Sequence, residues 1–201
     1  MPCETYLTVK SPASTEIRIK DSRFFAHLYH ANSRESAEKI LTGISQMYAS
    51  ATHNCSAYRV GIGDNCIFRL DDAGEPTGTA GKPILQALET RTISDSVLIV
   101  TRYFGGTKLG IGGLIRAYSS AAFAVLDVAK LYPVQPMAKI KFSFGFHDTG
   151  NIHKIINTFH ALILRTKYDN KVRMELSVSE NEKEKLLKSL NDVTRGEVEF
   201  E

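Results

Sequence analysis

Glycines and charged side chains are concentrated in two segments, residues 71–83 and residues 101–116, which together hold eight of the 14 glycines. Each segment leads from an expected strand into an expected helix. Glycine tolerates positive φ angles and lets backbone amides come close to a partner. Amides at a helix start point outward along the helix dipole and can bind an anion. The sequence therefore predicts one glycine-rich polar face on which the protein acts.

The second segment adds positive charge and aromatic rings to its glycines. Basic side chains are expected at the junction of loop and helix, where a phosphate would bind, and two rings are available to stack on bases. The residues predicted to contact nucleic acid or another anion are Arg102, Tyr103, Phe104, Lys108, Gly112, Gly113 and Arg116. An alternative interpretation stays open, in which the glycines only make turns, the rings pack in the core and the cations pair with nearby acids.

The first segment carries a motif of acids and glycines: Asp71, Asp72, Gly74, Glu75, Gly78, Thr79, Gly81 and Lys82. Its carboxylates could hold magnesium or share a proton. Acids clustered in a loop are more often solvated or paired, so no metal is predicted. Nucleotide motifs fail as well, because Pro83 stands where a P-loop needs Ser or Thr and Ile115 stands where a dinucleotide fingerprint needs its third glycine. The sequence predicts no cofactor.

Three side chains are candidates for catalysis: His53, Cys55 and Glu75. His53 and Cys55 lie two apart on an expected strand and therefore share a face, where the histidine could act as a base for the thiol. A buried thiol beside a hydrogen-bonded histidine is the favoured interpretation. The other histidines show no partner pattern and receive no role: His27, His30, His147, His153 and His160. The sequence leaves catalysis undecided and favours a protein that is not an enzyme.

Composition narrows the class of protein. With 201 residues, 43% of them apolar, the chain can bury a core in one large domain or two small ones. The formal charge is only +3, and the basic excess is small in both residues 1–136 and residues 137–201, so any nucleic-acid contact must be a local patch. Three cysteines without a CxxC motif, no secretory signal and no apolar run near roughly 18 residues predict a cytoplasmic protein with no membrane partner.

Alternation and helical spacing predict the elements of a first domain, residues 1–132. Strands are expected at residues 6–9, 15–20, 23–31, 55–62, 66–70 and 97–101. Gly63-Asp64-Asn65 is expected to form a hairpin turn. Ser33 is expected to cap a helix, with further helices over residues 83–88 and 114–131.

Two prolines within residues 132–136 mark the predicted domain boundary. Beyond it, residues 137–201 are expected to form strands at 139–146, 162–168, 172–178 and 198–200 and helices at 149–158 and 180–190. The order βαββαβ is the ferredoxin-like pattern. The predicted fold class is therefore α+β, with two domains.

The two glycine-rich segments also carry a family resemblance. Residues 72–81 read DAGEPTGTAG, and residues 101–118 read TRYFGGTKLGIGGLIRAY. Together with HNCSAY at residues 53–58, they resemble the signature of the YigZ/IMPACT family. The likeness covers residues 15–130 strongly and the tail more weakly. Ala73 departs from the pattern, because many members carry a second aspartate at this position.

The resemblance implies a first domain similar to the second domain of ribosomal protein S5 and to domain IV of elongation factor G. It also implies a ferredoxin-like second domain similar to elongation factor domain V. Eukaryotic relatives are linked to translational control under amino-acid starvation. We therefore expect an RNA- or ribosome-associated protein that modulates translation without catalysis.

Two alternatives of other classes stay open. One is an enzyme or sensor that holds a small phosphorylated or carboxylated ligand at the glycine-rich loops. The other is a scaffold that binds a protein partner through residues 137–201. The sequence does not determine the oligomeric state.

Overall fold

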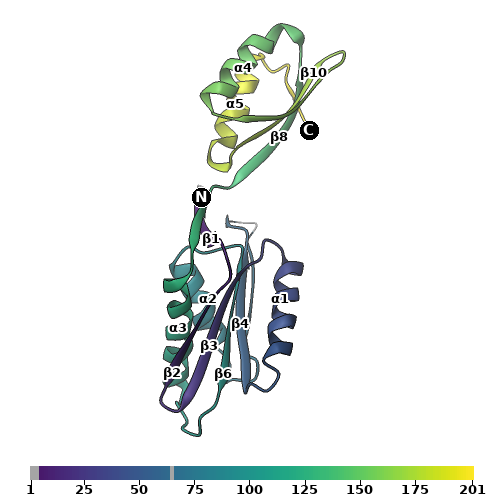
Figure 1. The fold of residues 1–201 in the computed structure, drawn as a ribbon. Coiled ribbons are helices and arrows are strands. Elements are labelled where there is room, and N and C mark those ends of the chain that lie inside the picture. The colour runs from purple at the N-terminus through teal and green to yellow at the C-terminus, as the bar shows by residue number, and fades with distance from the viewer. Residues whose placement is uncertain (1–4, 64–65) are drawn as a thin grey trace. The chain divides into compact units, whose positions relative to one another are not determined.

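A computed structural model describes residues 5–63 and 66–201, and its contacts divide the chain into two compact units (Figure 1). The N-terminal unit is Tyr6–Val134, and the C-terminal unit contains Gln135–Glu201. The sequence places its boundary within residues 132–136. The expected turn residues Asp64 and Asn65 lie outside the described residues.

A five-stranded antiparallel sheet forms the centre of the N-terminal unit, with the strand order β2-β3-β6-β4-β5. In chain order the elements are β1 (Tyr6–Val9), β2 (Ala13–Ile19), β3 (Ser22–His30), α1 (Arg34–Met47), β4 (His53–Val60), β5 (Ile67–Asp71), α2 (Gly81–Thr90), β6 (Ser96–Tyr103), α3 (Ile111–Val128) and β7 (Leu131–Val134). Ser33 caps α1 in a reciprocal capping box with Ser36, as the sequence predicts.

Helices cover both faces of this sheet (Figure 1). α2 and α3 lie on one face, where Leu98 and Val100 of β6 join the main core. α1 lies on the other face and packs with Val97 and Ile99 of the same strand. Because β6 is buried on both faces, its sequence is a continuous apolar run instead of an alternating one.

Strand β7 is absent from the sequence-based prediction, which extends the preceding helix to residue 131. The structure ends α3 at Val128, and β7 pairs antiparallel with β1, with Pro133 opposite Leu7. Proline is tolerated in a strand where its missing amide does not belong to the ladder, which is common at an edge. The proline segment therefore contains an edge strand of a two-stranded ribbon.

Helix α3 has the length of a membrane span, although Arg116 and Asp127 interrupt its apolar residues, consistent with the expectation that no apolar run reaches this length. Within the described part of the chain it is the one helix with both the length and the hydropathy of a span, with 18 residues and a mean hydropathy of 1.3. The apolar residues of α3 also form part of the core of the N-terminal unit. Small side chains such as Ala117, Ala121 and Ala122 are buried in the core and let the helix lie close to the sheet.

The loop between β6 and α3 is fixed against the turn between β2 and β3. The Gly105 amide donates to the Ser22 hydroxyl at 3.3 Å, and the Thr107 hydroxyl donates to the Asp21 carboxylate at 2.5 Å. A β-carbon on Gly105 would lie 1.8 Å from the carbonyl oxygen of Asp21. Only glycine fits at this position, so the loop that leads into α3 is held in one place.

The C-terminal unit is a four-stranded antiparallel sheet with the order β11-β8-β10-β9. Its elements are β8 (Met137–Phe144), a 3-10 turn (Phe146–Asp148), α4 (Thr149–Thr158), β9 (Leu162–Tyr168), β10 (Val172–Ser179), a second 3-10 turn (Glu180–Glu182), α5 (Lys183–Val193) and β11 (Glu199–Phe200). This is the ferredoxin-like arrangement that the sequence predicts. Together the two units confirm the α+β fold class.

One face of the C-terminal sheet packs on its helices, and the other carries exposed polar side chains. Phe142 and Leu176 belong to the core with Ile152 of α4 and Leu186 of α5. Buried and exposed residues alternate along β8. Within residues 135–201 the helices pack on the opposite face, and the polar side chains of this face are exposed.

The steric requirement at Gly105 can be tested with one substitution and a matched glycine control. We expect Gly105→Ala to lower the free energy of unfolding by about 2 kcal/mol or more, because overpacking forces the backbone to move. Gly43→Ala, in the middle of α1, places its β-carbon where no atom lies within 4 Å. The Gly43→Ala substitution should raise the free energy of unfolding by about 0.5–1 kcal/mol. Urea unfolding measures both, and a Gly105→Ala variant as stable as the wild type would contradict the docked loop.

Candidate functional site

Glu75 and Arg102 form a buried ion pair between the two glycine-rich segments. Nη1 of Arg102 lies 2.6 Å from Oε1 of Glu75, and the two side chains are only 6% and 4% exposed. On the sheet, Arg102 lies opposite Phe24 of β3 and His53 of β4. Its guanidinium lies 5.6 Å from the centroid of the Phe24 ring and 5.4 Å from that of Phe104. Arg102 is therefore withdrawn from the surface, which corrects its predicted role as a nucleic-acid contact.

Tyr118 and Cys55 extend this cluster into the core. The Tyr118 hydroxyl donates to Oε1 of Glu75 at 2.8 Å, and the Cys55 thiol lies 3.3 Å from that hydroxyl and 3.0 Å from the Asp72 carbonyl oxygen. Burial raises the pKa of the Cys55 thiol to about 12 and also raises the pKa of the Tyr118 hydroxyl. Both groups stay protonated at neutral pH. Cys55 is therefore a buried hydrogen-bonding thiol, not an activated nucleophile.

His53 is directed at the first glycine-rich loop. Its Nδ1 atom lies 2.8 Å from the carbonyl oxygen of Ala73, and since a carbonyl only accepts, Nδ1 carries a proton. Nε2 lies 3.8 Å from Oε1 of Glu75. A β-carbon on Gly74 would lie 3.5 Å from Nδ1 of the ring. The described contacts of His53 tie the loop to the sheet, and they do not include the base–thiol pair with Cys55, which the sequence leaves as the less favoured alternative.

The start of α2 is occupied by a carboxylate of the chain itself. Oδ1 of Asp72 accepts from the amides of Ala80 and Gly81 at 2.9 and 2.8 Å, and Oδ2 accepts from the Gly78 amide at 2.8 Å. Burial alone would raise the pKa of Asp72, but these three amides outweigh it and lower the pKa. An ionised carboxylate here neutralises the helix dipole. This loop is therefore closed to an external anion.

The other residues of the first motif have local roles. Oδ1 of Asp71 accepts from the Ala73 amide at 2.8 Å, and the Thr79 hydroxyl donates to a carbonyl three residues earlier at 2.6 Å. A β-carbon on Gly81 would lie 2.9 Å from the Asp71 amide nitrogen. Lys82 is exposed. The motif folds one loop tightly against β5, and its acids are used for that purpose.

The start of α3, by contrast, is open. Gly110 precedes the helix with a φ of 71°, no side chain caps the helix, and its first turn contains no acid. Lys108 and Arg116 are exposed, and neither pairs with a carboxylate in the described residues. Nη1 of Arg116 comes within 3.5 Å of the β-carbon position on Gly112. The structure thus places Arg116 beside the first turn of α3 and leaves Lys108 exposed in the loop before it, and an anion site there stays a prediction.

The two aromatic residues before this loop differ. Tyr103 packs edge-on against Phe25 with ring centroids 5.9 Å apart, and its hydroxyl lies 3.3 Å from that of Ser50. The Phe104 side chain is 44% exposed, and its ring lies against the guanidinium of Arg102. Phe104 is therefore the ring of this pair that is more open to a base.

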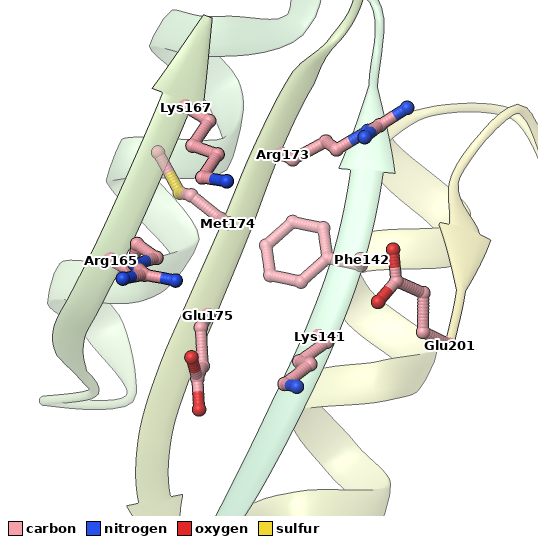
Figure 2. Close-up of a pocket in the computed structure, with 8 residues that line it drawn as sticks. All are labelled: Lys141, Phe142, Arg165, Lys167, Arg173, Met174, Glu175 and Glu201. Carbon is pink, nitrogen blue, oxygen red and sulfur yellow. The ribbon is translucent and has the colours of Figure 1, made fainter.

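A second charged surface lies on the polar face of the C-terminal sheet and is absent from the sequence-based prediction. A hollow of about 190 Å³ opens there, and the residues that line it are Lys141, Phe142, Arg165, Lys167, Arg173, Met174, Glu175 and Glu201 (Figure 2). We call the four exposed cations Lys141, Arg165, Lys167 and Arg173 the basic sheet face. None of the four forms an ion pair with a carboxylate among the residues that the structure describes.

The register of the sheet sets two of these cations against each other. Arg173 of β10 lies directly opposite Lys167 of β9, whereas Arg165 lies opposite Glu175. Like charges at directly opposed positions destabilise a sheet. Stability alone does not explain this pair, and a negatively charged ligand over the face would relieve the repulsion.

The sequence contains a signal for the basic sheet face, in the alternation of charged residues along each strand. Lys139 and Lys141, then Arg165 and Lys167, are spaced two apart, and such residues share a face. The net charge of residues 137–201 conceals this, because 11 basic and 10 acidic residues nearly cancel. A sum of charges says nothing about the side of the sheet on which each charge lies.

Removing the charge of Glu75 tests the buried pair. We expect Glu75→Gln to lower the free energy of unfolding by about 3–5 kcal/mol, because Arg102 is left charged and buried without its partner. Glu16→Gln is the control, because it removes a carboxylate whose partner Arg23 is exposed to solvent, and it should change stability little. Chemical denaturation of the two variants side by side gives the comparison. Equal effects would contradict the assignment of Glu75 and Arg102 as a buried pair.

The raised pKa of Cys55 predicts a thiol that resists alkylation. The thiolate is the reactive form, so reaction in the folded protein should stay slow until the pH approaches about 12. Cys66, which is partly exposed, should be modified first at pH 8. Peptide mapping after a timed iodoacetamide reaction reports both sites. Fast modification of Cys55 in folded protein would show an activated thiol and contradict this account.

Comparison with known proteins places the chain in a family. The model of the Impact N-terminal domain matches residues 20–126, and that of a domain of unknown function, DUF1949, matches residues 142–197. IMPACT family member YvyE of Bacillus subtilis is 36% identical over 192 residues, which are 96% of this chain and 88% of the relative.

Two further proteins are similar over most of their length. An IMPACT family member of Thermus thermophilus is 36% identical over 179 residues, which are 89% of this chain and 96% of the relative. A crystal structure described as that of a hypothetical protein has a TM-score of 0.66 and 26% identity, with 98% of this chain and 96% of that chain covered. The chain belongs to the IMPACT family.

Proposed function

We propose that this protein binds RNA through the phosphate backbone, on the basic sheet face of its C-terminal unit, and acts in translation without catalysing a reaction. The observation that carries the proposal is a set of four exposed cations, none of which forms an ion pair in the described chain, on a face that also holds Glu175 and Glu201. Lysine and arginine that neutralise phosphates supply most of the affinity for nucleic acid. A local patch of this kind is what a chain with a small net charge requires.

The geometry favours contacts to phosphates over reading of bases. The exposed ring of Tyr168 lies opposite Val172, and that of Phe200 lies opposite Phe142. Since Val172 and Phe142 face the helices, both rings belong to the helix side of the sheet. Phe142 lines the hollow but is buried, so the basic sheet face offers no exposed ring for stacking. Binding is expected to depend on charge and to vary little with sequence.

The family supplies the link to translation. The resemblance to elongation factor and ribosomal protein domains is a likeness of fold, and function has to be argued from the site. In the N-terminal unit, Glu75 accepts from Arg102, the Asp72 carboxylate accepts from the Gly81 amide, and Cys55 donates to the Asp72 carbonyl oxygen. They hold a loop in place, which supports a binding protein more than an enzyme.

A second candidate function is supported by the start of α3. There Lys108 and Arg116 are exposed beside uncapped helix amides. This arrangement suits one phosphate or carboxylate, either of a small ligand or of RNA. A Lys108→Ala/Arg116→Ala variant distinguishes this surface from the basic sheet face.

The proposal predicts salt-dependent RNA binding that is lost when the basic sheet face is neutralised. The variant is Lys141→Ala/Lys167→Ala/Arg173→Ala, and the probe is a 20-nucleotide oligouridylate followed by fluorescence anisotropy. We expect affinity at moderate salt to fall at least about tenfold. The slope of log affinity against log salt should shrink by about 2, since each single-strand phosphate contact contributes about 0.7. Loss of the opposed Arg173 and Lys167 should leave the unfolding free energy unchanged or raise it.

The matched control removes the same charge from the helix side of the same unit. Lys154→Ala/Lys185→Ala/Lys188→Ala changes three exposed lysines on α4 and α5 and should bind RNA like the wild type. Equal affinity of both triple variants would contradict the basic sheet face as the contact. Loss only in Lys108→Ala/Arg116→Ala would move the site to α3. No binding by the wild type at low salt would contradict the function.

A further inference from the structure

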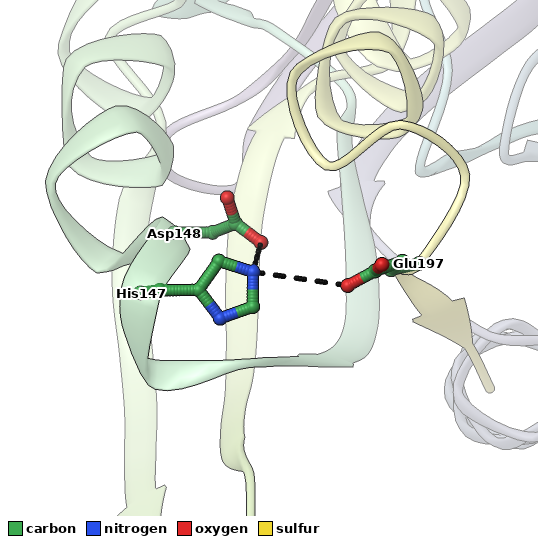
Figure 3. Close-up of side chains that lie close together, drawn as sticks. All are labelled: His147, Asp148 and Glu197. Carbon is green, nitrogen blue, oxygen red and sulfur yellow. Dashed lines mark ion pairs between the residues drawn. The ribbon is translucent and has the colours of Figure 1, made fainter.

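His147, Asp148 and Glu197 bring three potential metal ligands together in the C-terminal unit (Figure 3). His147 and Asp148 belong to the 3-10 turn after β8, and Glu197 lies in the loop between α5 and β11. Nε2 of His147 lies 3.1 Å from Oδ2 of Asp148 and 3.7 Å from Oε2 of Glu197. We propose that this cluster binds a divalent transition-metal ion such as Zn²⁺.

The separations of the ligand atoms suit such an ion. Bonds from Zn²⁺ to imidazole nitrogen and carboxylate oxygen are about 2.0–2.2 Å long, so two ligands at a tetrahedral angle lie about 3.4 Å apart. The distances of 3.1 and 3.7 Å from Nε2 of His147 fall on either side of this value. All three ligand atoms lie within 4.8 Å of one another. Small side-chain movements would complete three bonds to one ion.

Asp148 provides an independent sign that a ligand belongs here. It precedes α4 but does not cap the helix through its side chain, although aspartate at this position usually accepts from a helix amide. Its side chain is 10% exposed, and its buried Oδ2 atom accepts no hydrogen bond in the described chain, with the ion-pair contact to Nε2 of His147 beside it. Nε2 of His147 carries at most one proton and faces two carboxylate groups. A dication would compensate both carboxylates, which a single proton cannot do.

Gly145 makes room for the imidazole. Its φ of −72° and ψ of 146° are open to any residue, so the backbone does not require glycine. A β-carbon at this position would lie 2.7 Å from Cε1 and 2.9 Å from Nδ1 of His147. The absence of a side chain therefore lets the ring lie where its Nε2 atom faces Asp148 and Glu197.

The third ligand is held by a tight helix end. Gly196, with a φ of 87°, donates its amide to the carbonyl oxygen of Asn191 at 2.9 Å, and the Glu197 amide donates to that of Thr194 at 3.0 Å. The Glu197 backbone is thus fixed, and its carboxylate needs only rotamer changes to reach the ion. His147 and Glu197 are 71% and 67% exposed, so an ion has access and can keep water as a further ligand.

The donor set selects the class of metal. One imidazole nitrogen and two carboxylate oxygens suit Zn²⁺ and neighbouring first-row ions, whereas Ca²⁺ takes six to eight oxygens. Three protein ligands with positions open to water are typical of zinc sites that are not closed structural sites. An ion here would join the end of β8 to the segment before β11.

Metal titration of the untagged, chelator-treated full-length protein tests the site. We expect calorimetry to show Zn²⁺ binding, and Co²⁺ to give visible d–d absorption. His147→Ala and Glu197→Gln should each weaken Zn²⁺ affinity by at least about tenfold, since loss of an outer-shell partner alone costs that much. Both variants should also lose the Co²⁺ band. Glu197→Gln changes an exposed side chain and should stay folded.

His153→Ala is the matched control, because it removes another histidine of the C-terminal unit, on α4 and outside the cluster. It should leave Zn²⁺ affinity and the Co²⁺ spectrum unchanged. Zn²⁺ affinity that is the same in wild type, Glu197→Gln and His147→Ala would overturn the proposal. So would a wild-type protein that binds neither ion, or losses that are equally large in His153→Ala.

Discussion

The buried ion pair between Glu75 and Arg102 is the interaction on which the N-terminal unit depends. Glu75 comes from the loop before α2, Arg102 from the central strand β6, and Tyr118 from α3 donates to the same carboxylate. One carboxylate therefore ties a loop, a strand and a helix together. A buried charge is stable only with its partner in place, so each member of this cluster constrains the positions of the others. The polar residues that first suggest a reaction are used to hold the glycine-rich loops in place.

The loops before α2 and α3 differ in whether the start of the following helix is accessible to an anion. Asp72 fills the start of α2, so that loop is closed by the chain itself. The start of α3 has no such acid, and its loop is fixed instead by the close approach of Gly105 to Asp21. In the C-terminal unit, the sheet has helices on one face and cations on the other. Acids also lie on that face, Glu175 opposite both Lys141 and Arg165, but none of its four named cations forms an ion pair in the described chain.

Much of the fold can be predicted from sequence, because the signals are local. The strand periodicity of both units, the cap at Ser33 and the ferredoxin-like order all follow from residues close together in the chain. The sequence does not predict β7, because the prolines within residues 132–136 indicate a linker between domains instead of a strand. The burial of Arg102 is not predicted, for another reason. Because β6 is apolar on both sides, its sequence does not show on which face of the sheet the Arg102 side chain lies. That face is set by the register with Phe24 and His53.

The same limit applies to the charged sites of the C-terminal unit. The basic sheet face depends on which strands are neighbours, and β9 and β10 place Lys167 opposite Arg173 only through their register. The cluster at His147 requires Glu197, which is distant in sequence and is brought near by the packing of α5 and β11. Sites made of residues from separate elements are visible only when the sheet order and the register are known.

The most direct test of RNA binding on the basic sheet face is lysine footprinting of the 201-residue chain with and without oligouridylate, by acetylation and mass spectrometry. RNA bound on the basic sheet face should protect Lys141 and Lys167 from modification and leave Lys154, Lys185 and Lys188 as reactive as in the free protein. Protection of the helix-side lysines, or unchanged reactivity at Lys141 and Lys167 under conditions where RNA is bound, would contradict binding on that face.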